Sequence, residues 1–173
     1  MSYIVADMEA GDWEQVRSIY LEGIATGVAT FETSAPTWEK WDASHLRKMR
    51  LVARAGDRGD EGDGGEILGW AALSPVSDRC VYGGVAEVSV YVGERGRGRG
   101  IGRALLQSLV AASERNGIWT LQAGVFPENA ASIKLHLSCG FREVGRRERI
   151  GKLNGVWRDT LLLERRSQSV GAS

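Results

Sequence analysis

The most constraining feature of the sequence is a run of glycines and arginines between two regular patterns. Residues 88–92 alternate as a β-strand does, and apolar residues recur at helical spacing over residues 101–112. The intervening run, residues 94–103, has glycine at every second position from Gly96 to Gly102. Glycine lets a ligand approach the main chain, and a helix that begins there directs free N–H groups outward. The pattern therefore predicts a strand, a phosphate-binding turn and a helix.

The spacing within this run excludes two common phosphate-binding loops. No Gly-Lys-Ser or Gly-Lys-Thr follows to complete a Walker loop, and alternate glycines do not match G-x-G-x-x-G. What remains is the pattern Arg97-x-x-Gly100-x-Gly102. Similar runs occur in disordered nucleic-acid-binding segments, but this one is short and lies between regular elements. We therefore favour an ordered site for a phosphate or pyrophosphate and keep a nucleic-acid-binding turn as the alternative.

Length and composition predict one domain. A chain of 173 residues with 43% hydrophobic residues can bury one sizeable core but is too short for two ordinary domains. We assign residues 1–166 to this domain, and we expect residues 167–173, which are small and mostly polar, to form a flexible tail. Helices that interrupt a series of strands indicate an α/β fold.

Charge and cysteine content narrow the class of protein. The 22 lysines and arginines balance the 22 aspartates and glutamates, so no overall field attracts nucleic acid or an anionic membrane. No secretion signal and no membrane-spanning apolar stretch is recognisable in the sequence. We therefore expect a cytoplasmic protein with no nucleic-acid or membrane partner. Cys80 and Cys139 lack C-x-x-C spacing, which favours reduced thiols over a disulfide or a metal site.

The remaining patterns predict further strands and helices. We expect a first helix whose start is marked by a capping box of Asp12 and Gln15, and a second helix capped by Thr37. Strands are expected near residues 2–6, 50–55, 66–73, 85–92, 118–126, 141–150 and 156–164, with further helices near residues 101–115 and 130–138. The glycine- and aspartate-rich residues 56–65 are expected to form a long exposed turn.

The glycine loop and its flanks resemble the acetyl-CoA pyrophosphate loop of the GCN5-related N-acetyltransferase (GNAT) superfamily. A second segment, residues 129–141, is also similar to that superfamily. The resemblance implies a mixed, mostly antiparallel central sheet of six to seven strands flanked by about four helices. It also implies that the strands carrying Val90 and Val125 diverge, and that the pantetheine of acetyl-CoA lies between them, bonded to backbone near Val90 and Val92.

The resemblance implies acetyl-CoA as cosubstrate, and we expect no metal. The residues expected to bind the cosubstrate are Val90, Tyr91, Val92, Arg97, Gly98, Arg99, Gly100, Ile101, Gly102, Arg103, Asn129 and Ser132. Asn129 also has the position of a helix N-cap, which is by itself a sufficient explanation for an asparagine there.

A larger set of residues resembles one subgroup, the phosphinothricin N-acetyltransferases and related acetyltransferases of amino-acid analogues. The similar strings are Thr30-Phe31-Glu32, Arg79-x-x-Tyr82, Glu87-x-Ser89-Val90-Tyr91-Val92, Leu135-His136 and Gly155-x-Trp157-Arg158-Asp159. They extend over almost the whole chain, from about residue 4 to residue 164. The subgroup implies direct acetyl transfer to the α-amino group of a small amino-acid-like substrate, and its members commonly form homodimers.

Acetyl transfer from a thioester to an amine needs a base for the amine proton and a group that stabilises or protonates the departing thiolate. Strand alternation places Glu87 on the face opposite Val88, and the subgroup implies that Glu87 is the general base, directly or through water. Placement alone favours an ion pair with an arginine. His136 stands where many superfamily members carry a proton-donating tyrosine, and its imidazole suits proton transfer near neutrality. A hydrogen-bonded packing histidine is the alternative.

An amino-acid substrate carries an oxyanion, which a guanidinium binds through two parallel hydrogen bonds. We expect Arg79 to bind this group, with Phe31, Tyr82 and Val125 lining the pocket. A surface arginine and core aromatic residues are the alternatives. Other functions left open are acetylation of a protein N-terminus or a polyamine, and a non-catalytic CoA-sensing or nucleic-acid-binding module.

Overall fold

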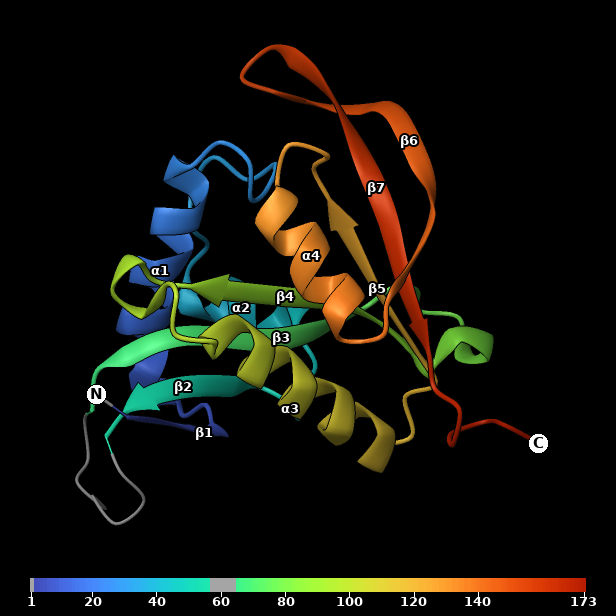
Figure 1. Cartoon of the computed structure of the whole chain (residues 1–173), viewed down its shortest axis with the longest axis horizontal. Coiled ribbons are helices and arrows are strands. Elements are labelled where there is room, and N and C mark those ends of the chain that lie inside the picture. Colours follow the sequence, from blue (N-terminus) through green and yellow to red (C-terminus); the bar gives the residue numbers. More distant parts are fainter. Residues whose placement is uncertain (1, 57–64) are drawn as a thin grey trace.

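The computed structural model describes residues 2–56 and 65–173, which form a seven-stranded sheet with helices on both faces (Figure 1). The strands are β1 (Tyr3–Asp7), β2 (Leu51–Ala55), β3 (Ile67–Pro75), β4 (Val85–Val92), β5 (Thr120–Val125), β6 (Arg142–Leu153) and β7 (Val156–Arg166). The α-helices are α1 (Trp13–Ala25), α2 (Trp38–Ser44), α3 (Ile101–Arg115) and α4 (Ala130–Ser138), with 3-10 turns η1 (Ala10–Asp12), η2 (Cys80–Tyr82) and η3 (Glu94–Gly96). The predicted α/β fold is confirmed.

The sheet is mixed because one neighbouring pair of strands is parallel. Its order is β1-β2-β3-β4-β5-β7-β6, and among the neighbouring pairs of the described strands only β4 and β5 are parallel. These two strands pair over three residues each, Val85–Glu87 with Thr120–Gln122. Beyond those pairs β4 continues to Val92 and β5 to Val125, and the two strands separate (Figure 1). The predicted divergence is therefore confirmed.

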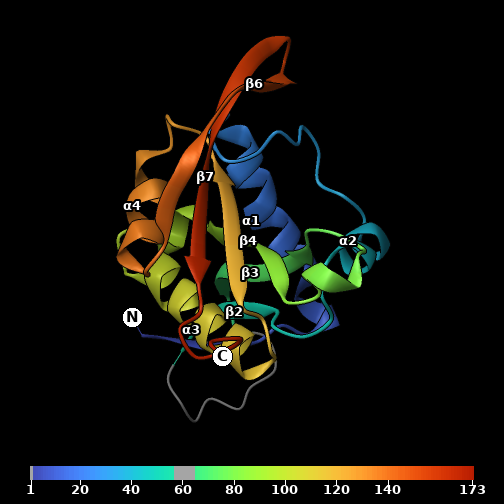
Figure 2. The ribbon, with the colours of Figure 1, turned by 90° about the vertical axis from the view of Figure 1, so that its right-hand side faces the viewer.

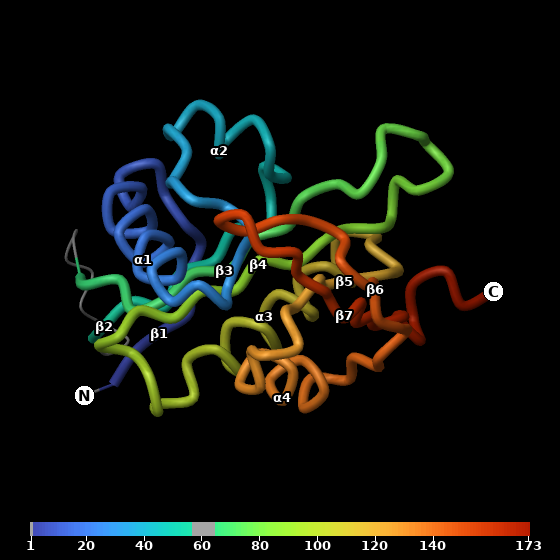
Figure 3. Tube along the Cα trace, turned by 90° about the horizontal axis from the view of Figure 1, so that it is seen from above, coloured from blue at the N-terminus to red at the C-terminus, as the bar shows by residue number. Residues whose placement is uncertain are grey.

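Each face of the sheet has its own hydrophobic core. Helices α1 and α2 cover one face, and α3 and α4 cover the other (Figures 2 and 3). Under α3 the core is aliphatic, with Leu105 and Leu109 packed against Val88 of β4. Under α1 and α2 it is aromatic, and Trp41 and Trp70 lie with ring centroids 5.7 Å apart. Alternate side chains of β4 therefore face different helices, as strand geometry requires.

Arg50 connects the end of α2 to β2. Its guanidinium donates to the backbone carbonyls of Asp42, His45 and Leu46 at 3.0, 3.1 and 2.7 Å, and it also pairs with the Asp42 carboxylate. The same group lies 5.1 Å from the centroid of the Trp41 ring. Because the side chain of Arg50 is only 10% exposed, it supplies hydrogen-bond donors to carbonyls that the end of a helix leaves without partners.

We expect Arg50→Ala to lower the free energy of unfolding by about 3 kcal/mol, because three carbonyls lose a charged donor in a shielded position. Arg142→Ala is the matched control. Arg142 pairs with Glu164 at 2.8 Å but its side chain is 68% exposed, so a change below about 1 kcal/mol is expected. Urea unfolding followed by circular dichroism measures both variants, and equal losses would contradict the role given to Arg50.

Helix α1 begins where it was predicted to, with Asp12 as its N-cap residue, but the predicted capping box is wrong. Asp12 and Gln15 do not form a capping box; the reciprocal pair lies earlier, at Glu9 and Asp12, around η1. The Asp12 carboxylate also pairs with Arg54 of β2 at 3.0 Å, and Gln15 Oε1 accepts from the backbone N–H of Ile67 at 2.8 Å. Both side chains therefore tie the start of α1 to the sheet, which local sequence does not show. The predicted cap of α2 is confirmed, since Thr37 accepts from the N–H of Lys40.

Two further predictions concern the exposed turn at residues 56–65 and the C-terminal tail at residues 167–173. Residues 57–64 of the predicted exposed turn lie outside the described residues. Ser167, at the start of the predicted flexible tail, is buried and donates from Oγ to Glu114 at 2.9 Å. Arg166 donates to the carbonyls of Val170 and Gly171 at 2.8 and 2.7 Å. The tail thus has contacts that its composition does not predict, and its flexibility stays a prediction.

None of the helices in the described part of the chain has the length and apolar character needed to cross a membrane.

Candidate active site

A cleft of about 900 Å³ lies where β4 and β5 separate. Its walls come from β4, β5, α4, the segment that follows α1, and the β6–β7 hairpin. In the described part of the chain, β4 beyond Glu87 pairs with β3 but not with β5. Backbone N–H and C=O groups on the β5 side of β4 therefore face the cleft, where an extended ligand can pair with them as another strand would.

Most of the predicted site residues line this one cleft, although they come from distant parts of the sequence. They are Glu87, His136, Val90, Tyr91, Val92, Arg97, Asn129, Ser132, Phe31 and Val125. The fold therefore assembles the predicted base, the predicted acid and much of the predicted cosubstrate site around a single opening.

The rest of the glycine loop borders the cleft at the start of α3. Gly98 and Gly100 have φ values of 74° and 76°, in the left-handed region that side-chain-bearing residues enter only at a cost. Gly102 lies close to Val92 and Leu135. A Cβ atom at position 102 would be 3.4 Å from the side chain of Val92 and 3.3 Å from that of Leu135. The first N–H groups of a helix have no partner within it, so the start of α3 offers donors for a phosphate beside the cleft.

The arginine and isoleucine side chains of this loop differ in their exposure and in whether they line the cleft. Arg97 lines the cleft, and Arg103 is exposed on the first turn of α3. Arg99 is partly buried near the N-cap, Gly100. The side chain of Ile101 is 1% exposed and packs in the core, so only its backbone can contact a ligand.

Arg79 and Tyr82 do not line the cleft. They lie at η2, near the start of β4, whereas the cleft opens along the later part of that strand. Both are exposed, and the Arg79 guanidinium lies 5.5 Å from the centroid of the Tyr82 ring. The connection from β3 to β4 thus directs these side chains toward each other, and the arrangement does not support their predicted contacts with the substrate.

Glu87 is the last β4 residue paired with β5, so its carboxylate lies where the strands separate. Its Oε1 accepts from Gln122 Nε2 at 3.4 Å, and its side chain is exposed within the cleft. No arginine in the described ranges forms an ion pair with it. The carboxylate is therefore accessible to a ligand, and the ion pair considered as an alternative is not observed.

His136 is 4% exposed and has a defined tautomer. Its Nδ1 lies 2.7 Å from the carbonyl oxygen of Ser132, and since a carbonyl only accepts, Nδ1 carries the proton. Its Nε2 is then an acceptor, and this buried atom has no hydrogen-bond partner among residues 2–56 and 65–173. Burial lowers the pKa of His136 below its ordinary 6.5, opposed by the Ser132 bond. The imidazole is therefore neutral at pH 7 and offers a lone pair to a donor.

We expect NMR to find His136 as the Nδ1–H tautomer, titrating below pH 6.5. The chain has one other histidine, His45, so His45→Gln assigns the two sets of ¹H–¹⁵N signals. Burial also lowers the pKa of His45, whose Nδ1 is 2.8 Å from the carbonyl of Trp41. An Nε2–H tautomer or a pKa above 6.5 at His136 would contradict the geometry.

The segment after α1 is held over the cleft from α4. Asn129 Oδ1 accepts from the backbone N–H of Ser132 at 3.1 Å, which confirms the predicted cap of α4. Asn129 Nδ2 donates to the carbonyl of Val28 at 3.2 Å. The same amide therefore caps one wall of the cleft and anchors another, a second role that the sequence did not indicate.

The same segment is also held from the β6–β7 hairpin. Arg158 of β7 donates to the carbonyl of Gly27 at 3.0 Å, and its guanidinium lies 4.2 Å from the centroid of the Phe126 ring. Phe31 packs edge-to-face on Phe126 with centroids 4.8 Å apart, and a Cβ built on Gly151 of β6 would lie 3.1 Å from the Phe31 ring. Phe31 is thus fixed between β5 and the hairpin at the edge of the cleft.

Sequence reasoning missed the hairpin residues that line the cleft, Arg147, Ile150 and Thr160. Strand alternation would be the signal for them, but β6 has register shifts between Glu143 and Gly145 and between Arg147 and Gly151. Each shift changes which side chains share a face, so the alternation cannot be read from the sequence there.

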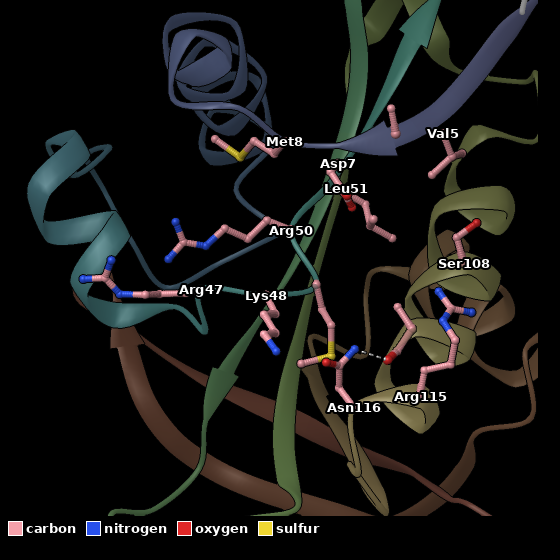
Figure 4. A pocket seen from close by; sticks show the side chains of 13 residues that line it. Val5, Asp7, Met8, Arg47, Lys48, Arg50, Leu51, Ser108, Arg115 and Asn116 are labelled. Carbon is pink, nitrogen blue, oxygen red and sulfur yellow. Dashed lines mark hydrogen bonds between the residues drawn. The ribbon is translucent and has the colours of Figure 1, made fainter.

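A second cavity of about 710 Å³ lies between β1, the segment before β2 and the end of α3 (Figure 4). It contains none of the predicted site residues. Four of its lining residues are cationic, but Arg47 and Arg50 extend toward α2 whereas Arg115 lies along α3 on the opposite side (Figure 4). Their charges do not converge on one point, and Arg50 is already paired with Asp42. The cleft between β4 and β5 is therefore the better candidate for the active site.

The sequence matches the model of the acetyltransferase (GNAT) family over residues 13–141, which include the separating strands and the glycine loop. The chain belongs to this family. It is accordingly an acetyl-CoA-dependent N-acetyltransferase.

Named relatives of this GNAT protein act on small amino-acid analogues. The phosphinothricin N-acetyltransferase of Alcaligenes faecalis is 35% identical over 161 residues, which cover 89% of this chain and 77% of that protein. An L-methionine sulfoximine/L-methionine sulfone acetyltransferase of Pseudomonas aeruginosa is 28% identical over 167 residues, with coverage of 95% and 94%. The structure of a phosphinothricin acetyltransferase from Sinorhizobium meliloti in complex with AcCoA has a TM-score of 0.85 at 28% identity, covering 100% of this chain and 92% of that one. The predicted resemblance to this subgroup is confirmed.

Proposed function

We propose that this enzyme transfers the acetyl group of acetyl-CoA to the α-amino group of a small amino-acid-like acceptor of the phosphinothricin or methionine sulfoximine type. The observation that carries the proposal is the position of Glu87, an accessible carboxylate at the point where β4 and β5 separate. The start of α3 and Arg97 border the same cleft and suit a pyrophosphate. The relatives named for amino-acid analogues support the class of acceptor.

The reaction that suits this arrangement is direct transfer. The neutral amine nitrogen bonds to the acetyl carbonyl carbon, the carbon–sulfur bond breaks, and the sulfur leaves as a thiolate. Glu87 takes the proton that the amine loses, directly or through one water molecule. The thiolate takes up one proton in turn, which balances the proton lost by the neutral amine, so the net products are an amide and a thiol.

The geometry of His136 fits the role of hydrogen-bond acceptor better than that of proton donor to the thiolate. Its only proton in the neutral form is held by the Ser132 carbonyl, and burial disfavours a second proton. The unpaired Nε2 can accept from an N–H or hydroxyl group of a bound cosubstrate. The role of His136 in the cleft thus becomes orientation of the cosubstrate, with the thiolate protonated from elsewhere.

Glu87→Gln is expected to reduce kcat by about 10²- to 10⁴-fold, because the amide cannot take the amine proton. The loss should shrink as the pH rises, since more of the acceptor amine is already neutral. Release of free CoA, measured with a thiol reagent, gives the rates. Glu143→Gln is the control, because Glu143 is exposed on β6 and outside the cleft. Unchanged kcat in Glu87→Gln would contradict the assignment of the base.

The acceptor class can be tested with a panel of amines. Phosphinothricin, methionine sulfoximine, ordinary amino acids, polyamines and a peptide N-terminus would each be assayed for CoA release. A polyamine site should be rich in acids, but Glu87 is the one acid among the described lining residues, beside Arg97 and Arg147. No release with any amino-acid analogue would end the proposal for that class.

The nucleic-acid alternative has less support. The arginines of the glycine loop do not form a free basic stripe, because Arg95 pairs with Glu66 of the neighbouring β3 side. Binding through phosphates would also have to be sensitive to salt. The ordered loop beside a cleft instead suits one small phosphorylated ligand.

We also propose that the enzyme is a homodimer that pairs through the β6–β7 hairpin. This hairpin projects from the body of the domain (Figures 1 and 2). It exposes Val144, Ile150, Val156 and Trp157, of which the last is 54% exposed. Val156 and Trp157 are adjacent at the tip of the hairpin, and an exposed apolar group there suits an interaction surface.

Sedimentation velocity is expected to find a dimer for the unaltered chain and a shift toward monomer for Trp157→Lys, because a charge at the interface opposes burial. Val81→Lys is the control, since Val81 is 62% exposed but lies in η2, away from the hairpin. A monomeric unaltered chain at micromolar concentration would contradict the dimer.

A further inference from the structure

Arg147 is a charged residue of the cleft that the cosubstrate and the proposed base leave without a role. Three charged side chains of the described residues line the cleft, Glu87, Arg97 and Arg147. Glu87 is the proposed base, and Arg97 belongs to the glycine loop at the start of α3. Arg147 comes from β6, on the hairpin wall, and the family resemblance assigned nothing to it.

The guanidinium of Arg147 has no hydrogen-bond or ion-pair partner among residues 2–56 and 65–173, in contrast to the guanidinium groups of Arg142, Arg146 and Arg158 on the same hairpin. Arg146 is held by the Asp159 carboxylate at 2.7 Å, and Arg142 by Glu164 at 2.8 Å. Arg158 is held by the carbonyl of Gly27. The guanidinium of Arg147 is therefore free to bind an anion from solution.

The strand pairing shows which face Arg147 occupies. It lies directly opposite Thr160 of β7, and both line the cleft. Arg146 is opposite Leu161, which is buried in the core beneath α3, so consecutive arginines are on opposite faces of the hairpin. The far end of the hairpin leans toward the face covered by α1 and α2 (Figures 2 and 3). Arg147 thus faces the side of the sheet that carries Phe31.

Glu87 belongs to that same side. In β4 it shares a face with Tyr91, whose ring packs against Tyr20 of α1 at 5.0 Å, whereas Val88 faces the core under α3. The start of α3, with its phosphate-binding donors, lies on the other face (Figure 3). Arg147 and Glu87 therefore lie on the same side of the cleft, away from the start of α3.

We propose that Arg147 binds the carboxylate of the acceptor amino acid and so determines its specificity, an inference that rests on the proposed function. A guanidinium binds a carboxylate through two parallel hydrogen bonds, while Glu87 faces the amine of the same molecule. This assignment replaces Arg79, which lies outside the cleft over Tyr82. It also explains selectivity, because a polyamine brings a further positive charge toward Arg147 and a peptide N-terminus lacks the α-carboxylate.

The test compares acceptors with and without the carboxylate. L-Methionine sulfone and its decarboxylated amine, 3-(methylsulfonyl)propylamine, would be assayed by CoA release with the unaltered enzyme, Arg147→Ala, Arg147→Lys and Arg146→Ala. In Arg147→Ala we expect the KM for the amino acid to rise about 10- to 100-fold, with kcat and the KM for acetyl-CoA nearly unchanged. The kcat/KM for the amine should stay the same or rise. Arg147→Lys should give an intermediate KM, since lysine keeps the charge but not the planar pair of donors.

Arg146→Ala is the matched control, being adjacent in sequence, equally charged and on the opposite face. It should leave both acceptors within about twofold of the unaltered enzyme, as expected for a surface pair. The proposal is overturned if Arg147→Ala leaves the KM for the amino acid unchanged, if it weakens both acceptors equally, or if Arg146→Ala has the same effect. An unaltered enzyme that acetylates neither methionine sulfone nor the other amino-acid analogues removes the proposed function itself, and the role of Arg147 with it.

Discussion

The separation of β4 and β5 after three paired residues is the constraint on which the rest of this structure depends. Two parallel strands that remained paired would use their backbone groups on each other and would close the sheet. Because they part after Glu87 and Gln122, one edge of β4 is left facing an opening in the middle of the domain. The two separate cores keep that opening in place, since β4 is packed on α3 through Val88 and on α1 through Tyr91.

The opening joins the two faces of the sheet, which explains why the site residues come from such different elements. The start of α3 presents backbone donors on one face, and the segment after α1 and the hairpin form walls on the other. That segment has little regular structure of its own, and it is fixed by the side chains of Asn129 and Arg158. The wall formed by this segment is thus fixed by long-range hydrogen bonds, whereas the start of α3 depends on the conformation of one loop.

This difference sets how much the sequence could predict. Strand β4 and helices α3 and α4 begin and end where the sequence analysis placed them, because alternation, helical periodicity and glycine positions are local properties. The start of α1 at Asp12 was also predicted, but not the partners of its side chains: Asp12 pairs with Arg54 and Gln15 with Ile67, both far away in sequence. The structure leaves Arg79 outside the cleft, since a loop between strands carries no periodic signal that fixes its direction. Arg147 was missed because register shifts in β6 break the alternation that would have revealed its face.

The cleft has a local charge balance that differs from that of the whole chain. The chain has a formal net charge of zero, yet the described lining of the cleft carries two arginines and one carboxylate, with a histidine kept neutral by burial. The neutral imidazole adds no charge to the cleft, so its charged groups in the described lining are Glu87, Arg97 and Arg147. An anionic diphosphate suits the end with Arg97, and in our proposal Arg147 binds an anion while Glu87 accepts a proton. On that proposal a molecule with an amine and a carboxylate would engage both groups, whereas a simple amine would leave the guanidinium without a partner.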